Sequence, residues 1–461
     1  MHSSDTWIHK NEKLIFFAIF LLMCSGFAVR QHVISYSIGS GGNLYYSYLP
    51  TILLDHDLNI SNQLDAMPYK NMTSPLFYQH KAGYATTSTG LTANDNSIGP
   101  AIFWSPFFIA GHAIVLTSNH YVGTNIRTDG LSNVEQILCM LGSIMYAVIG
   151  LYLCYRFATK FLPRWACLTA TFFITFGYSV IHYIMIEPSM AHGITIFTVA
   201  LFITYFYSHR FDHTFRKWFI LGILAGLMML SRWDTGFILP IFCGWYWLDM
   251  FWTEDDRWKF NFTNTKLNLI LRGFTFLAGV IITFSPQMLI WKILFGGATT
   301  LPTDVINIID FTHPLLYEFT LSWQHSLFIS TPIIILACLG FFAFYKKDKW
   351  FTFTTIMTLL LIIYVNSSLQ ELGGNAFGAR RMIDCTIFFI LGLAALLAWA
   401  HKKKLLWPII AICLFFISYN LIYLLEYNLN IINRFKPVTP LDIYNGIKKI
   451  IPLFLKYTRI S

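Results

Sequence analysis

Long apolar runs alternate with short polar segments along almost the whole chain. An α-helix needs about twenty apolar residues to cross a bilayer, and the runs have roughly this length. Eleven runs are clear, and they cover residues 13–29, 134–155, 164–184, 189–207, 217–231, 235–252, 271–294, 326–345, 349–366, 382–400 and 405–425. The pattern predicts an all-α polytopic membrane protein with these runs as its transmembrane helices.

Basic clusters between the runs predict how the helices are oriented. They are Lys10 and Lys13; Arg156, Lys160 and Arg164; Arg210, Arg216 and Lys217; Arg257, Lys259, Lys266 and Arg272; Lys346, Lys347 and Lys349; and Lys402, Lys403 and Lys404. The positive-inside rule places them all in the cytoplasm, which requires an even number of crossings between Lys13 and Arg156. A twelfth apolar run, 97–117, is therefore expected to lie in the outer interface, and Pro100 and Pro106 fit a broken segment. The alternative is an ordinary span with the topology inverted.

This topology makes residues 30–133 one large extracytoplasmic loop, which carries the interfacial helix 97–117. We expect a transmembrane domain over residues 1–425 and a basic C-terminal tail over 426–461 that lies on the membrane surface. The first apolar run has no small-residue cleavage site, so we interpret it as a retained span.

The composition agrees with a membrane protein and argues against a nucleic-acid-binding protein and a disulfide-rich protein. The chain is 56% hydrophobic and 12% charged, whereas a soluble domain is about a quarter charged. The net charge of +9 does not indicate nucleic acid binding, because much of it lies in the topology clusters. The eight cysteines lie in or beside apolar runs and predict neither a disulfide framework nor a metal site.

Polar residues near the predicted spans gather on the outer side. They are Asp55, Asp57, Glu187, His192, Arg232, Asp234, His325, Arg380 and Arg381. Charges at membrane depth are rare and tend to be functional. We therefore expect an active site at the outer membrane interface.

Asp55 and Asp57 are the first candidates, because they lie early in the large loop, soon after the aromatic segment YYSYLP. A carboxylate there can take a proton from an attacking hydroxyl, and the pair also offers the hard oxygen ligands that a divalent cation prefers. The alternative is that both are cap or turn residues.

The outer arginines fit the recognition of a phosphate. Arg380 and Arg381 follow the glycine-rich GGNAFG segment, and guanidinium groups match phosphate geometry. The alternative role is an interfacial anchor. Arg232 is a further phosphate-binding candidate, and the alternative is that it pairs with Asp234 in a tight turn.

The remaining outer residues are candidates for contact with the substrate, and each also has a purely structural interpretation. Glu187 lies at a span junction before a proline, and His192 and His325 fit satisfied histidines on helix faces.

Several ordered motifs resemble those of the bacterial GT-C glycosyltransferases. They are YYSYLP followed by HDL, IGPAIFWSPFFIAGH, DGLS, SRWDTG, SPQMLIWKILFGG, SLFISTPIIILACLGF and GGNAFGARRMID. Relatives in the wider superfamily are aminoarabinose transferases acting on lipid A and protein O-mannosyltransferases. The resemblance covers residues 36 to 400.

This resemblance implies an inverting glycosyltransferase in the bacterial inner membrane. Its sugar donor is a polyprenyl phosphate, its acceptor is a cell-envelope glycan or a lipid-linked molecule, and transfer occurs on the extracytoplasmic face without a redox cofactor. Basic residues near the outer surface hold the lipid phosphate, and an acidic residue early in the loop is the general base. The aromatic residues of the loop, including Tyr45, Tyr46 and Trp104, are candidates for stacking on a sugar.

The chain departs from the family pattern at two places. Residues 39–43 carry no carboxylate before the YY segment, so the base is expected to be Asp57, with Asp55 next and Asp95 or Glu187 after them. Residues 370–372 are Gln, Glu and Leu, whereas family members often have tryptophans before the FG-Arg segment. Two other functions stay open, namely a lipid or sugar transporter or flippase, and a non-catalytic membrane subunit.

Overall fold

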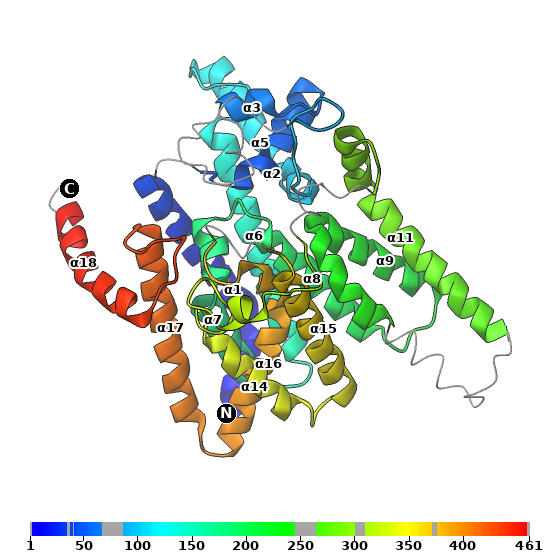
Figure 1. The fold of residues 1–461 in the computed structure, drawn as a ribbon, viewed down its shortest axis with the longest axis vertical. Coiled ribbons are helices and arrows are strands. Elements are labelled where there is room, and N and C mark those ends of the chain that lie inside the picture. Colours follow the sequence, from blue (N-terminus) through cyan, green and yellow to red (C-terminus); the bar gives the residue numbers. More distant parts are fainter. Residues whose placement is uncertain are drawn as a thin grey trace. The chain divides into compact units, whose positions relative to one another are not determined.

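The computed structural model describes residues 2–34, 37–39, 41–66, 86–244, 264–299, 309–370 and 376–458. These residues form helices joined by turns and loops (Figure 1), and their β-structure is limited to two isolated bridges, Thr86 with Thr92 and Ile309 with Leu369. The prediction of an all-α protein is confirmed for this part of the chain.

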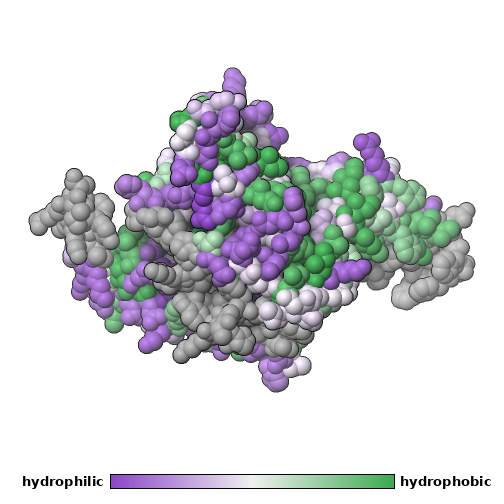
Figure 2. Space-filling model, turned by 90° about the horizontal axis from the view of Figure 1, so that it is seen from above, coloured by the Kyte–Doolittle hydropathy of each residue, from purple (hydrophilic) through white to green (hydrophobic). Residues whose placement is uncertain are grey.

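Seven helical segments of the described residues are long and apolar enough to cross a membrane. They are Asp5–His32, Gly99–Val122, Asn133–Ala158, Leu267–Phe295, Lys349–Ser367, Arg380–Lys402 and Leu406–Asn428. Large apolar side chains are exposed on some helices, such as Phe274 at 64% and Phe342 at 80%, and Figure 2 shows hydrophobic patches on the surface in green. An exposed apolar surface of this kind suits lipid, so the chain is a multi-pass membrane protein. The count of eleven spans stays a prediction.

The chain divides into two compact units. The first unit comprises Met1–Lys13, Cys154–His182 and Asn307–Ser461, and the second comprises Leu14–Leu153 and Tyr183–Ile306. Three elements run across the division, and they are α1 (His2–Ile34), α6 (Asn133–Ala158) and the π-helical turn η3 (His182–Ile186).

The first unit is built around α16. Its other elements are α7 (Arg164–Gly177), α13 (Leu316–Leu321), α14 (Ile333–Phe344), α15 (Lys349–Ser367), η5 (Arg380–Cys385), α17 (Leu406–Asn428) and α18 (Pro440–Thr458). The segment Arg380–Lys402 contains η5 and α16 (Thr386–Lys402). In its most apolar stretch 94% of the residues are buried, as expected for a helix that is apolar on every side. Gly392 lets α14 approach, because a Cβ there would collide with the Ala337 carbonyl.

The second unit packs its helices through small residues. Its elements are α2 (Gly42–Pro50), η1 (Thr51–Asp55), α3 (Ser61–Ala66), α5 (Gly99–Thr117), η2 (Ser118–Val122), α8 (His192–Ser208), α9 (Phe215–Ser231), η4 (Trp233–Ile238) and α11 (Asn264–Phe295). α9 carries a GxxxG pattern at Gly222 and Gly226, and a Cβ at Gly222 would collide with the Phe276 carbonyl of α11. Such patterns allow two membrane helices to lie close together.

α5 covers the run 97–117 for which the sequence predicts an interfacial position. From Ala101 onward its buried residues recur every three or four positions, at Ala101, Trp104, Phe108, Gly111 and Val115. The opposite face exposes apolar side chains, including Ile109 and Ile114. One side of α5 therefore packs on protein and the other suits lipid. The interfacial position itself stays a prediction.

The predicted basic tail contains α18, which packs one side on its own unit. Ile443 is 5% exposed, and a Cβ at Gly446 would collide with the carboxyl group of Glu426 in α17. Leu441, Tyr444 and Lys448 on the other side are exposed. The location of this helix on a membrane surface stays a prediction.

Candidate functional site

A small open pocket lies in the first unit at the start of the buried segment that leads into α16. It is lined by Glu318, Phe319, Gln324, His325, Gly378, Ala379, Arg380 and Arg381. Its volume of about 20 Å³ holds one or two water-sized groups, such as the oxygens of a phosphate. The pocket thus brings together three sequence candidates, His325, Arg380 and Arg381.

The two arginines begin η5, the turn that continues directly into α16. The N-terminal end of a helix favours negative charge, so two cations at this position cost stability unless an anion is close. The side chain of Arg380 forms no ion pair with any described carboxylate, including the exposed Glu318 of the same pocket. The geometry at Arg380 therefore suits an anionic ligand better than a structural ion pair.

The backbone before the arginines is held in place by its own unit. Gly378 has a left-handed φ of 59°, and a Cβ there would collide with the hydroxyl of Ser179, so only glycine fits. The Tyr178 hydroxyl donates to the Ala379 carbonyl at 3.0 Å. These contacts fix the direction in which Arg380 leaves the backbone, which gives the last glycine of GGNAFG a structural role.

His325 is buried beside the arginines, and one hydrogen bond defines its tautomer. Its backbone φ is 52°, and its Nε2 lies 2.7 Å from the carbonyl oxygen of Arg434. A carbonyl only accepts, so Nε2 carries the hydrogen. Burial lowers the pKa of His325, the bond to the carbonyl opposes that shift, and the positive charges of Arg380 and Arg434 lower the pKa further. His325 is therefore a neutral donor at pH 7.

In the second unit, Asp55 and Asp57 lie exposed at the end of η1. Asp55 Oδ2 accepts hydrogen bonds from the side-chain amides of Asn62, at 2.9 Å, and Gln63. Asp57 Oδ1 accepts from the backbone amide of Asn59 at 3.1 Å, which is the turn arrangement that the sequence left open. The two carboxylates thus bind different partners. No group of three or more His, Cys, Asp or Glu side chains in the described ranges has the geometry to hold a metal ion.

The aromatic side chains predicted to contact a sugar are buried instead. Tyr45, Tyr46 and Trp104 are 8%, 0% and 0% exposed. The Tyr46 hydroxyl donates to the Gly130 carbonyl at 2.7 Å, and burial raises its pKa well above the usual value, so it stays a donor. Rings in these positions pack the fold and offer no open face to a sugar.

Arg232 pairs with Asp234, as the structural alternative predicted. The Arg232 guanidinium binds both carboxylate oxygens, with Nε to Oδ1 at 3.1 Å, and its Nη1 donates to His192 Nδ1 at 3.0 Å. The structure brings these three candidates together in one cluster of the second unit. Because the guanidinium already binds a carboxylate, Arg232 is less suited to a phosphate than Arg380.

Asp95 and Glu187, the next candidates for the base, lie in two different loops of the second unit. Asp95 is half-buried in the loop before α5, and its charge contributes to the raised pKa of Tyr48, after burial. Glu187 is half-buried in the turn between η3 and α8, where its carbonyl accepts from the amide of Met190 at 3.2 Å.

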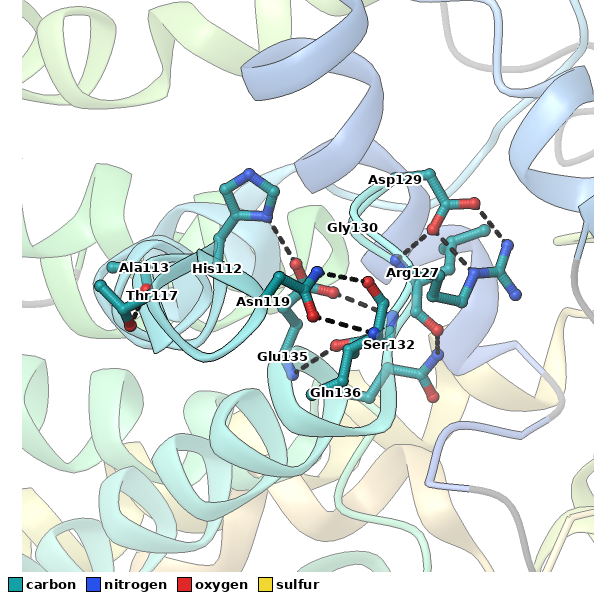
Figure 3. A network of polar contacts seen from close by, with 12 residues as sticks. His112, Ala113, Thr117, Asn119, Arg127, Asp129, Gly130, Ser132, Glu135 and Gln136 are labelled. Atoms are coloured by element: carbon teal, nitrogen blue, oxygen red, sulfur yellow. Dashed lines mark hydrogen bonds and ion pairs between the residues drawn. The ribbon is translucent and has the colours of Figure 1, made fainter. Parts of the chain in front are cut away.

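The sequence reasoning missed a buried pair, His112 with Glu135 (Figure 3). His112 Nδ1 lies 2.6 Å from Glu135 Oε1, and the Glu135 side chain is fully buried. The other oxygen, Oε2, accepts from the Ser132 amide at 2.9 Å, while the Glu135 amide donates to Ser132 Oγ at 3.4 Å. This reciprocal arrangement is a capping box at the start of α6, and its S-x-x-E spacing was the available signal.

The same network joins the ends of α5 and α6 to the loop between them. In Figure 3 the second ring nitrogen of His112 points away from Glu135. Asn119 binds Ile126 through its side-chain amide at 2.7 Å, and Arg127 Nε donates to Asp129 at 2.8 Å. The side chain of Arg127 holds the pKa of Asp129 below its usual value, against the effect of burial. Hydrogen bonds thus link the end of α5, the loop after it and the start of α6 within the second unit.

No protein-family model matches the chain, and no curated protein matches it.

Proposed function

We propose that this protein is an integral-membrane glycosyltransferase of the GT-C type that takes a sugar from a polyprenyl phosphate. The observation that carries the proposal is the pocket at the start of η5, where Arg380, which forms no ion pair with a carboxylate of the described residues, lies beside Arg381 and His325. The ordered sequence motifs support it, because four residues of the GGNAFGARRMID motif, Gly378 to Arg381, line this pocket. We propose the bacterial inner membrane as its location and the extracytoplasmic face as the side of reaction.

The cationic pocket suits the chemistry of a phosphate leaving group. An acceptor hydroxyl attacks the anomeric carbon from the face opposite the phosphate, so the configuration inverts. The bond from this carbon to the phosphate oxygen breaks, and the electron pair leaves with the lipid phosphate. Donors that are already in place where negative charge develops lower the barrier. Arg380 and Arg381 hold the phosphate in this proposal, and His325, whose Nε2–H is bound to the Arg434 carbonyl, supports the wall of the pocket.

The proton of the attacking hydroxyl needs an acceptor. We propose a carboxylate of the outer loop, Asp57, with Asp55 as its nearest competitor. Both are exposed and in contact with solvent, which leaves them accessible to an acceptor glycan or lipid.

The affinity of the Arg380→Ala variant for lipid phosphate tests whether this pocket binds the phosphate. Loss of one charge-assisted contact costs about 2 kcal/mol, which weakens binding about 30-fold. We expect this loss when a short-chain polyprenyl phosphate is titrated into the purified full-length protein in detergent. Arg381→Ala is expected to weaken binding in the same assay.

Arg210→Ala is the matched control. Arg210 is half-buried near a helix end like Arg380, but its guanidinium stacks 3.8 Å from the Tyr207 ring centroid, and it lies outside the pocket. Its replacement removes the same charge and should leave binding unchanged. Wild-type affinity in both Arg380→Ala and Arg381→Ala would reject the phosphate site.

A further inference from the structure

Glu318 differs from the other residues that line the pocket in its charge and its exposure. It is the carboxylate among the lining residues, and it is exposed, whereas Phe319 and His325 are buried. Asp384, the carboxylate of the turn η5, is buried and is not a lining residue. Glu318 therefore lies at the open rim of the pocket.

Hydrogen bonds hold the short helix α13 that carries Glu318. Before it, the Leu315 amide donates to the Ser367 carbonyl of α15 at 2.7 Å. After it, the Leu327 amide donates to the Phe319 carbonyl at 2.9 Å. The backbone on both sides of Glu318 is thus fixed, which gives its side chain a defined place beside the pocket.

Two other polar side chains of the pocket are bound by the protein itself. The Gln324 side-chain amide donates to the Phe435 carbonyl at 3.2 Å, and His325 Nε2 donates to the Arg434 carbonyl at 2.7 Å. Both carbonyls belong to residues 429–439, the segment between α17 and α18, which returns to the pocket. These two side chains therefore support the wall of the pocket.

Glu318 and Arg380 line the same pocket without pairing. Among the described residues, neither side chain forms an ion pair, and the Glu318 carboxylate accepts no hydrogen bond. Opposite charges that line one pocket and stay unpaired suit a ligand with both a negative group and hydrogen-bond donors. A sugar phosphate is such a ligand, since its phosphate is an anion and its hydroxyl groups are donors.

We propose that Glu318 binds the sugar of the lipid-linked donor and selects neutral or amino sugars over uronic acids. When Arg380 holds the phosphate, the sugar attached to it extends toward the open rim, where Glu318 lies. A carboxylate there accepts hydrogen bonds from hydroxyl or ammonium groups. It repels the carboxylate of a uronic acid, which is attached next to the ring oxygen and close to the phosphate.

This inference rests on the proposed function and assigns Glu318 a place in it. Glu318 shares the pocket with the leaving phosphate, whereas the acceptor hydroxyl attacks from the opposite face, so Glu318 contacts the sugar without being the base. As the bond to the phosphate oxygen breaks, positive charge develops on the sugar ring, and a nearby carboxylate stabilises this charge.

Pairs of donors that differ in one group test the selection in the full-length protein. The lipid is a short polyprenyl phosphate, and the paired sugars are glucose and glucuronic acid, galactose and galacturonic acid, and mannose and mannuronic acid. Affinity is measured in detergent at pH 7.5, where both members of a pair carry the same phosphodiester charge. We expect the wild type to bind the neutral member of at least one pair about ten times more tightly. This ratio should fall in high salt, because charges at the exposed rim are screened.

Variants of Glu318 locate the source of the selection. Glu318→Gln keeps the size of the side chain and removes its charge, so the ratio should fall to about threefold or less. Glu318→Lys should reverse the preference in favour of the uronic acid. Both variants should bind the sugar-free lipid phosphate at least as tightly as the wild type does, in contrast to Arg380→Ala.

Asp212→Asn is the control for the loss of a carboxylate. Asp212 is exposed in the second unit, and its Oδ1 accepts from the Thr214 amide at 2.9 Å, a bond that the asparagine oxygen retains. This variant should show the wild-type ratio for every pair.

The outcomes separate this inference from the proposed function. If the wild type bound both members of every pair equally, or if the ratio were unchanged in Glu318→Lys, this inference would be overturned and the phosphate site would remain. Selection against uronic acids by a protein that transfers no sugar would support this inference and reject the proposed function. A wild type that binds no lipid phosphate at all would reject both.

Discussion

Replacing His112 with phenylalanine removes the donor of the hydrogen bond to Glu135 and keeps an aromatic ring of similar size. The imidazole stacks on Phe108 at 6.1 Å with an interplanar angle of 3°, so a phenyl ring retains that packing. A hydrogen bond to a charged group contributes about 1.5–3 kcal/mol, and among the described residues the fully buried Glu135 carboxylate would keep the Ser132 amide as its donor. We expect the free energy of unfolding to fall by about 2–3 kcal/mol.

A double-mutant cycle separates the pair from the rest of the capping box. Glu135→Gln removes the charge and keeps an oxygen that can accept from Ser132. Unfolding of the wild type, the two single variants and the double variant is followed in detergent with increasing denaturant. The coupling between the two substitutions should be about 1.5–2 kcal/mol, because the two groups lie 2.6 Å apart.

His120→Phe serves as the control for this cycle. His120 is exposed, and its ring contacts the exposed Tyr121, so its replacement should change stability by about 0.5 kcal/mol or less. If His112→Phe lowered the free energy of unfolding by less than the control does, or if the coupling energy were near zero, the reasoning about the buried pair would be refuted.

The remaining predictions concern topology, the base and pH. A cysteine introduced near Asn71, which lies outside the described residues, and another near Asn428 should both react with an impermeant thiol reagent from outside, and protection of the first in intact cells would contradict the topology. Asp57→Asn should abolish sugar transfer with donor binding intact, whereas full rates in both Asp57→Asn and Asp55→Asn would exclude the two carboxylates. The lowered pKa of His325 means that the unfolded chain binds a proton more readily than the folded protein. Stability should therefore fall as pH drops below about 6.5, and more steeply in the wild type than in His325→Gln. Parallel pH curves for these two proteins would contradict the assignment of His325.

The helices were predictable because their signal is local. The run 405–425 is apolar over the length of a membrane helix whatever it packs against, and α17 (Leu406–Asn428) begins one residue later and ends three residues later than this run. The arginines of the pocket were also predictable, since Arg380 and Arg381 follow a glycine-rich segment at the predicted outer end of a span.

The partners of polar side chains were not predictable, because they depend on tertiary structure. His112 and Glu135 are 23 residues apart and meet only because α5 and α6 lie together. The sequence suggested that Tyr46 could contact a substrate, but all of α2 is buried, and the Tyr46 hydroxyl binds the Gly130 carbonyl of a distant loop. The return of residues 429–439 to the pocket depends on backbone carbonyls, which carry no sequence signal.

Release of lipid phosphate by the purified protein tests the central claim most directly. The full-length protein is supplied with a panel of polyprenyl-phosphate sugars and an acceptor extract, and the free lipid phosphate is measured over time. We expect turnover with at least one donor and, for Arg380→Ala, a rate at least tenfold lower at limiting donor. No release from any donor, or equal rates for Arg380→Ala and the wild type, would contradict the account.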